Sequence, residues 1–230
     1  MNEFNNKSYP CNVTDIITVN KRLRHRLRNL CAGVTMTTDR IAQLVEDLHP
    51  DLSMRCQVVK EEMLRLQVLT ERMDLLYEIL PVPESISLLE LITELRAFFT
   101  QKFPFCNLIL NGPQQDVSFK FGSYLLIALT ELLQNVGECN SNSDLYMKWS
   151  IDGNNVFFSV ENILNEPFFK EVNLETPAPF ITNKTRHDGL GLAIVQRLVL
   201  ALDGELNLKI DKKEDVETFI AKVSLTLDNS

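Results

Sequence analysis

Two closely spaced glycines that run straight into an apolar segment constrain the fold of this chain more than any other feature. Gly189 and Gly191 stand directly before Leu192-Ala193-Ile194-Val195, and the basic residue Lys184 precedes them. Glycine lets the backbone turn sharply, and the first turn of a helix exposes N–H groups that have no partner within the helix. Such N–H groups bind anions. The sequence therefore predicts a phosphate-binding loop at the start of a helix over residues 190–202.

The composition is typical of a soluble globular protein. The chain has 230 residues, of which 45% are hydrophobic and 23% charged, enough to bury a core in one large domain or two modest ones. No apolar run approaches the roughly 20 residues that span a bilayer, and residues 1–9 lack the order of a signal peptide. The five cysteines lie far apart and none forms a Cys-x-x-Cys pair, which argues against a disulfide framework or a zinc site. A reduced, cytoplasmic location is expected.

The charge of the chain is acidic except in one short segment. A net charge of −8 at pH 7 argues against general affinity for nucleic acids or acidic membranes, and membrane insertion is not expected. The exception is a basic cluster around His25, made of Lys21, Arg22, Arg24, Arg26 and Arg28. This cluster is either a solvated helix face or a patch that attracts an acidic protein partner.

The first third of the chain predicts an antiparallel helical hairpin over residues 14–80, after an N-terminal tail over residues 1–13. Apolar residues recur at spacings of three and four, which predicts one long helix with one buried stripe. His49-Pro50-Asp51 ends this helix, and a second pattern from Val59 to Leu80 follows. A second copy of the chain is expected to complete the core as a four-helix bundle. The predicted stripe of the first helix consists of Ile16, Leu23, Leu27, Leu30, Val34, Ile41, Leu44 and Leu48.

The remainder, residues 84–230, predicts a mixed domain, so the fold class is α+β. The turn Asp152-Gly153-Asn154-Asn155 joins two strands as a hairpin. A loop over residues 163–188 is long enough to suggest a functional segment. Helices are expected over residues 87–99, 122–138 and 190–202, and strands over residues 108–110, 145–151, 156–160, 205–210 and 218–227.

The predicted helix over residues 122–138 has a polar face beside an apolar one. At 100° per residue, Glu131, Asn135 and Glu138 gather on one side, apart from the seam formed by Leu125, Leu129, Leu132 and Val136. A carboxylate and a carboxamide four residues apart can hold a hydrated magnesium ion against nucleotide phosphates. An ordinary solvated helix face is the alternative interpretation.

His25 is predicted to lie in water, opposite the apolar stripe of the first helix, with Asn29 one turn further on the same face. Arginines around an exposed imidazole disfavour its protonated form and leave more of the neutral nucleophile. A guanidinium such as that of Arg28 could also hold a phosphoryl group. An unremarkable surface histidine is the alternative.

The order of these features resembles the transmitter core of two-component sensor histidine kinases. That core is a dimerisation and phosphotransfer hairpin followed by a two-layer α/β sandwich of the GHKL (Bergerat) ATPase type, and the resemblance covers about residues 14–228. His25-Arg26-Leu27-Arg28-Asn29 looks like the phosphoacceptor box and Glu131-Leu132-Leu133-Gln134-Asn135 like the N box. Pro179-Phe180-Ile181-Thr182-Asn183-Lys184 looks like the F box and Gly189-Leu190-Gly191-Leu192 like the second glycine box; these two are the more specific motifs.

The resemblance implies a role for each motif. His25 would carry a phosphoryl group and pass it to the receiver domain of a response regulator that docks on the hairpin. Asn29 stands where some members place a residue that orients water for dephosphorylation. ATP and Mg²⁺ would be the cofactors, with Asn135 binding magnesium through the nucleotide. The nucleotide-binding residues would be Glu131, Asn135, Asn162, Lys184, Gly189, Leu190, Gly191 and Leu192.

Three departures from the family pattern bear on the use of ATP. Arg26 follows the histidine where the family has an acid that can act as general base, and arginine cannot accept a proton. The adenine-reading Asp-x-Gly-x-Gly box is replaced by Glu161-Asn162-Ile163-Leu164-Asn165, so Asn162 would meet the adenine without a charge. His187 replaces the first glycine of the second glycine box.

Three functions are compatible with this sequence. The first is a homodimeric phosphorelay protein of histidine kinase architecture that transfers phosphoryl groups through His25. The second is an ATP-independent histidine phosphotransferase with a degenerate ATP-binding domain, which Arg26 and the missing glycines favour. The third is a non-catalytic interaction module that sequesters a regulator through the hairpin.

Overall fold

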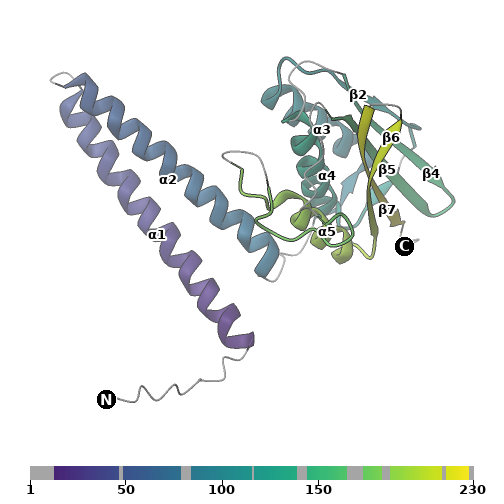
Figure 1. Ribbon diagram of the computed structural model, residues 1–230, viewed down its shortest axis with the longest axis horizontal. Coiled ribbons are helices and arrows are strands. Elements are labelled where there is room, and N and C mark those ends of the chain that lie inside the picture. Colours follow the sequence, from purple (N-terminus) through teal and green to yellow (C-terminus); the bar gives the residue numbers. More distant parts are fainter. Residues whose placement is uncertain are drawn as a thin grey trace. The chain divides into compact units, whose positions relative to one another are not determined.

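The computed structural model describes residues 13–46, 49–78, 84–115, 117–138, 144–164, 173–182, 187–213 and 216–227. Contacts between Cα atoms divide the chain into two compact units, Met1–Ile79 and Leu80–Ser230. Among these described residues, the first unit contains two long helices, and the second contains two sheets and three helices (Figure 1).

The first unit is a helical hairpin. Helix α1 spans Val13–Val45 and helix α2 spans Pro50–Tyr77, and the two pack along each other (Figure 1). Pro50 occupies the start of α2, where its missing N–H and fixed φ suit the first helical turn. The break predicted at His49-Pro50-Asp51 therefore coincides with the start of α2.

Helix α1 carries two apolar faces, not the single buried stripe predicted from the sequence. Cys31 is fully buried on the face toward α2. Leu30, although part of the predicted stripe, is 60% exposed, and Leu23, Ile41 and Leu44 are exposed with it. Adjacent residues are about 100° apart around a helix, so Leu30 and Cys31 mark two different faces. In the sequence, apolar residues spaced three and four apart can belong to either face, so the spacing alone does not show that α1 has two apolar faces about 100° apart.

The second unit is built on a five-stranded mixed sheet of order β2-β4-β5-β7-β6. Strand β2 (Leu108–Asn111) pairs parallel to β4 (Leu145–Asp152). The antiparallel pairs are β4 with β5 (Asn155–Ile163), β5 with β7 (Val216–Thr226), and β7 with β6 (Glu205–Lys213). A second sheet of two residues per strand pairs β1 (Ile86–Ser87) with β3 (Ser118–Phe119). Such short strands show no alternation, and the sequence did not predict them.

Three helices, α3 (Leu88–Lys102), α4 (Gly122–Gly137) and α5 (Gly191–Ala201), lie on one side of this sheet (Figure 1). Side chains of a strand alternate between the two faces, and Met147, Val160 and Ala221 are fully buried on the helix side. The predicted apolar seam of α4, Leu125, Leu129, Leu132 and Val136, is at most 1% exposed and forms the centre of this core. The unit is therefore a two-layer α/β sandwich.

Helix α3 begins at a capping box. The Ser87 hydroxyl accepts a hydrogen bond from the Glu90 backbone N–H, and the Glu90 carboxylate accepts one from the Ser87 N–H. These two bonds satisfy N–H groups that the first turn leaves unpaired. Hydrogen bonds from the Ser87 backbone and side chain also lower the pKa of Glu90.

Within the residues described, no helix has the length and apolar character needed to cross a membrane.

Candidate functional site

The imidazole of His25 lies exposed on a third face of α1. It is about 120° around the helix from Cys31, which faces α2, and about 140° from Leu30, which marks the exposed apolar face. Asn29 is exposed one turn later, and its Nδ2 lies 3.3 Å from Nδ1 of His25. A histidine in this position can meet a macromolecular partner without any rearrangement of the hairpin.

The residue before His25 is buried and charged. Arg24 is 1% exposed, and its Nε donates to Oδ1 of Asp74 at 2.6 Å while Nη2 donates to Oε1 of Glu78 at 3.0 Å. Its guanidinium also lies 5.9 Å from the centroid of the Tyr77 ring. The acids of α2 that hold Arg24 also bind Lys21, with Nζ 3.2 Å from Oε2 of Glu78, and Arg28, through Oδ2 of Asp74.

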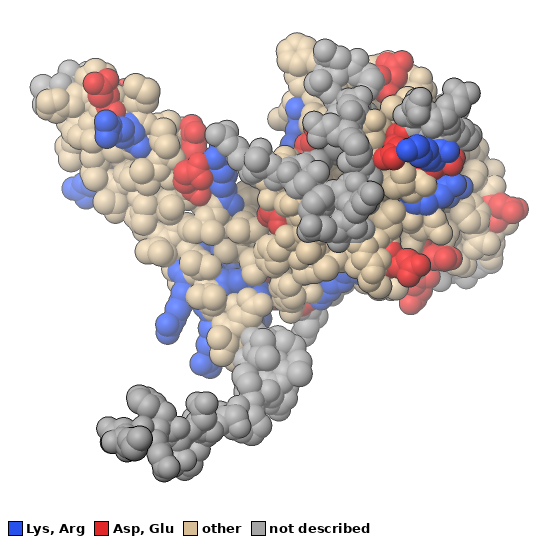
Figure 2. Space-filling view, in the orientation of Figure 1, with Lys and Arg blue, Asp and Glu red and all other residues tan. Residues whose placement is uncertain are grey.

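This ion-pair cluster changes the interpretation of the basic segment. Figure 2 shows Lys and Arg side chains gathered toward the end of the hairpin at which α1 begins. Three of the five cations that the sequence placed around His25, namely Lys21, Arg24 and Arg28, are engaged by carboxylates of α2. Arg22 and Arg26 are exposed and form no ion pair with a residue that the structure describes.

Glu78 is held ionised by this cluster. Burial raises the pKa of its carboxyl group, but hydrogen bonds from Lys21 and Arg24 outweigh burial, so the pKa lies below its ordinary value. A lowered pKa means that the ionised form is favoured in the folded hairpin. The cluster therefore ties α1 to α2 through charge as well as through apolar packing.

In the second unit, the residues of the predicted N box and second glycine box meet. A Cβ atom added at Gly191 would lie 2.9 Å from Nδ2 of Asn135 and 3.1 Å from Oε2 of Glu131. Both polar side chains of α4 therefore approach the start of α5, where the first backbone N–H groups have no hydrogen-bond partner within the helix. Oxygen ligands beside a helix N-terminus suit a magnesium ion that accompanies phosphate.

The segment that resembles the F box approaches the same glycine loop. The Phe180 N–H donates to the carbonyl oxygen of Gly189 at 3.0 Å. Gly189 has φ = 66°, and an added Cβ would lie 2.9 Å from the backbone N of Ile181. Glycine is needed here for both reasons. Lys184, predicted to contact the triphosphate, lies outside the described residues.

Two carboxylates stand beside the glycine loop that precedes α5. Nδ1 of His187, the residue in the place of the first glycine, lies 3.2 Å from Oε2 of Glu138. Asp188 Oδ1 accepts a hydrogen bond of 3.0 Å from the backbone N–H of Leu190. Negative charge at this place opposes the binding of another anion. The sequence did not reveal this, because the proximity of Glu138 to His187 depends on how α4 and the loop before α5 pack.

The remaining residues predicted for a nucleotide lie on or near the helix-covered side of the sheet. Asn162, near the end of β5, is 4% exposed. Leu190 is fully buried and Leu192 is half-buried. A buried carboxamide can both donate and accept hydrogen bonds, so Asn162 is chemically able to hold the edge of a base.

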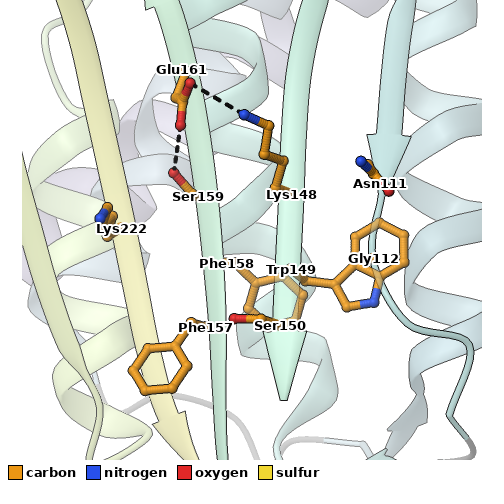
Figure 3. Close-up of a pocket in the computed structure, with 10 residues that line it drawn as sticks. All are labelled: Asn111, Gly112, Lys148, Trp149, Ser150, Phe157, Phe158, Ser159, Glu161 and Lys222. Carbon is orange, nitrogen blue, oxygen red and sulfur yellow. Dashed lines mark hydrogen bonds and ion pairs between the residues drawn. The ribbon is translucent and has the colours of Figure 1, made fainter. Parts of the chain in front are cut away.

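The opposite side of the sheet carries a separate, shallow hollow, shown in Figure 3. Lys148 on β4 lies 3.6 Å from the carboxylate of Glu161 on β5, and Lys222 on β7 lines the same hollow. Trp149 also lines the hollow, and its indole N–H donates to the carbonyl oxygen of Pro113 at 3.0 Å. Of the residues predicted from the sequence to act in catalysis or nucleotide binding, none that the structure describes lines this hollow.

The cluster of Asp74 and Glu78 is the part of the site that sequence reasoning missed. Both acids lie in the last turn of α2 or just after it, at the end of the hairpin opposite the turn. An antiparallel hairpin brings the end of its second helix beside the start of its first. The sequence signal that could have revealed the cluster was the presence of two acids at the end of the second helix, where the hairpin places them beside the five basic residues of the first.

No protein-family model matches the chain, and no curated protein matches it. Solved structures do match. Full-length ShkA in complex with AMPPNP has a TM-score of 0.68 at 18% identity, over 91% of this chain and 46% of that chain. The Acinetobacter baumannii histidine kinase AdeS has a TM-score of 0.56 at 16% identity, over 84% of this chain and 97% of that chain.

The mycobacterial sensor histidine kinase MprB has a TM-score of 0.54 at 19% identity, over 64% of this chain and 98% of that chain. At such identities the likeness is one of fold. It includes both parts of the chain, because ShkA and AdeS cover more than four fifths of it. The chain therefore has the fold of the two-component histidine kinase transmitter core, a helical hairpin followed by a GHKL-type α/β domain.

Proposed function

We propose that this protein is a cytoplasmic phosphorelay protein that carries a phosphoryl group on His25 and exchanges it with the receiver domain of a response regulator. The observation that carries the proposal is the placement of His25: an exposed imidazole on α1, turned away from α2 and from the exposed apolar face. A neutral imidazole is a nucleophile that can take and return a phosphoryl group. The hairpin on which it stands belongs to a chain with the histidine kinase fold.

The charge around His25 suits an acidic partner. Arg22 and Arg26 are exposed on either side of it in the sequence and are not neutralised by any described carboxylate. A receiver domain has an acidic phosphoacceptor pocket, and complementary charge raises the rate of encounter. The two arginines would guide docking, whereas Arg28, which binds Asp74, would hold the helix in place beside the transferred group.

A homodimer through the hairpin is part of the proposal. Leu23, Leu30, Ile41 and Leu44 form an exposed face on α1, and each helix of a four-helix bundle needs two apolar faces, one for each neighbour. The face marked by Leu30 lies about 100° from the face marked by Cys31, close to the angle that a square arrangement of four helices requires. A second copy of the hairpin is the occupant that fits this face.

Use of ATP is a separate question. Glu131 and Asn135 would hold magnesium, and the backbone around Gly189, Leu190, Gly191 and Leu192, together with Lys184, would hold the triphosphate. The approach of Asn135 and Glu131 to Gly191 supports this assignment. When bound, ATP would supply the phosphoryl group for His25.

An ATP-independent histidine phosphotransferase is the second candidate, and one observation favours it. Glu138 and Asp188 place carboxylates at the phosphate end of the site, paired with His187 and with the Leu190 N–H respectively. Asp188 thus uses an N–H group that a phosphate would otherwise meet. In this form of the proposal the phosphoryl group on His25 comes from one receiver domain and goes to another.

Two donors distinguish the candidates. The purified protein is incubated with Mg²⁺ and radiolabelled ATP, or with receiver domains from the same genome that have been labelled with phosphate, and acid-labile label is measured. Label from ATP identifies a kinase; label from receivers alone identifies a phosphotransferase. His25→Gln should abolish label from either donor, while His49→Gln, at an exposed histidine of the same hairpin, should keep it. Label that survives in His25→Gln contradicts the proposal.

A further inference from the structure

The side chain of Asn29 is the hydrogen-bonding neighbour of the His25 ring. Its Nδ2 lies 3.3 Å from Nδ1 of His25, and both side chains are exposed. Among the described residues, no carboxylate forms a hydrogen bond with this ring: Asp74 and Glu78 are bound to Lys21, Arg24 and Arg28. The residue after His25 is Arg26, whose guanidinium offers donors only.

A partner at Nδ1 decides which ring nitrogen can act as nucleophile. A neutral imidazole carries one proton, on Nδ1 or on Nε2, and the other nitrogen has the lone pair. A hydrogen-bond acceptor beside Nδ1 keeps the proton there and frees Nε2. A donor beside Nδ1 has the opposite effect and places the proton on Nε2.

A carboxamide can play either part. With its nitrogen toward Nδ1, as in the structure, Asn29 donates and favours the Nε2–H tautomer. Half a turn of the amide group about the Cβ–Cγ bond brings Oδ1 to the same place, where it accepts from Nδ1–H and leaves the Nε2 lone pair free. The exposed position of Asn29 leaves room for this turn.

We propose that Asn29 is the positioning residue that sets the tautomer of His25 for phosphoryl transfer, in place of an acid next to the histidine. This inference rests on the proposed function of His25. The Nε2 lone pair forms a bond to phosphorus while the bond from phosphorus to the receiver's aspartyl oxygen breaks, and that electron pair leaves with the carboxylate. The proton stays on Nδ1 of the phosphoimidazolium, held by Oδ1 of Asn29, so no general base is required.

The tautomer can be measured without any phosphate donor. Long-range ¹H–¹⁵N NMR of the full chain, with ¹⁵N-labelled histidine, reports the ratio of Nδ1–H to Nε2–H at His25 at about pH 8.5, where imidazole is neutral. We expect a larger Nδ1–H fraction in the wild type and in Asn29→Asp, whose carboxylate accepts only, than in Asn29→Ala. Gln43→Ala is the matched control, because Gln43 is an exposed amide at the same angle around α1 as His25.

The rate of transfer from a phosphorylated receiver is the second readout. Asn29→Ala should slow labelling of His25 about 10-fold or more, a loss like that seen when a metal-bound histidine loses the partner that orients its ring. Asn29→Asp and Gln43→Ala should stay within about 3-fold of the wild type, since the acceptor is kept or untouched. Both sites, Asn29 and Gln43, are exposed helix positions, and alanine favours the helix.

The outcomes separate this inference from the function on which it rests. An unchanged tautomer ratio in Asn29→Ala overturns the inference, as does equal loss of rate in Asn29→Ala and Asn29→Asp. If the wild type takes no label from any donor while the tautomer still depends on Asn29, the relay function fails and the positioning contact stands.

Discussion

At the scale of single residues, the burial of Arg24 explains why His25 faces outward. Arg24 is held by Asp74 and Glu78 and lies against Tyr77. Because the next residue of a helix is about 100° further around the axis, a fixed Arg24 turns His25 away from α2. A leucine at position 24 would fill the space but would specify the rotation of α1 less strictly than a charge with two partners.

Replacement of Arg24 should destabilise the hairpin strongly. Arg24→Ala leaves the carboxylates of Asp74 and Glu78 without their buried cation, and breaking such a pair costs about 3 kcal/mol or more in free energy of unfolding. Arg22→Ala is the control, at an exposed arginine without an ion pair to a described residue, and should change that free energy by less than about 0.5 kcal/mol. Urea unfolding followed by circular dichroism measures both; similar values would contradict the role given to Arg24.

Gly153 and Gly189 both have positive φ, but only Gly189 is crowded by other atoms. Replacing each by alanine therefore distinguishes the cost of backbone strain from the cost of crowding. Gly153 has φ = 57° and no atom within 4 Å of an added Cβ, whereas Gly189 has φ = 66° and backbone atoms at 2.9 Å. Gly153→Ala should therefore cost about 1 kcal/mol, the usual penalty of a left-handed residue. Gly189→Ala should cost about 2 kcal/mol or more, because the added methyl also displaces the Phe180–Ile181 backbone. Equal losses of unfolding free energy in the two variants would contradict the close contact between Gly189 and the Phe180–Ile181 backbone.

At the scale of elements, α1 packs one apolar face against α2 and has a second, exposed apolar face, which a second copy of the chain covers in the proposed homodimer. Leu30→Glu places a charge on the exposed apolar face and should convert the homodimer into monomer in light scattering coupled to size exclusion, since a buried unpaired charge is costly. Gln43→Glu adds the same charge on the His25 face and should leave the dimer intact. A wild-type monomer, or a Leu30→Glu dimer, would contradict the proposed four-helix bundle.

The ion pairs between α1 and α2 also predict how stability depends on pH. Burial alone would raise the pKa of Glu78 in the folded protein. Hydrogen bonds from Lys21 and Arg24 have the larger, opposite effect, so the pKa is lowered. A lowered folded pKa contributes stability that is present above the unfolded pKa and is lost as pH falls through the folded pKa. The free energy of unfolding should therefore decrease from about pH 5 to about pH 3, and less steeply in Glu78→Gln. An identical slope in the variant would contradict this role of Glu78.

The elements themselves could largely be predicted from the sequence, for physical reasons. The seam of α4 is buried as predicted, because a single apolar face of a helix has a regular period. The turn at Gly153 lies between strands that pair as a hairpin, because glycine readily takes the positive φ that this tight turn has at position 153. The two faces of α1 were merged into one, since Leu30 and Cys31 are neighbours in sequence and only the position of α2 tells them apart.

At the scale of the whole molecule, the fold predicted from four motifs is confirmed, while the chemistry of individual sites stays a prediction. The approach of Asn135 and Glu131 to Gly191 follows from packing of α4 against α5, which the motif order anticipated. The engagement of Arg24 by α2, and of His187 by Glu138, depends on contacts between distant segments. No local sequence pattern reveals contacts between distant segments. These contacts would nevertheless have the largest effect on the chemistry of His25 and of the proposed nucleotide site.

The measurement that tests the central claim most directly is the location of the phosphoryl group. After incubation with a phosphorylated receiver or with Mg²⁺ and ATP, the protein is digested at neutral to mildly alkaline pH, and the modified residue is identified by mass spectrometry. The account predicts phosphohistidine at His25 and nowhere else on the chain. Phosphate on His49, His187 or a hydroxyl side chain, with His25 unmodified under both donors, would contradict it.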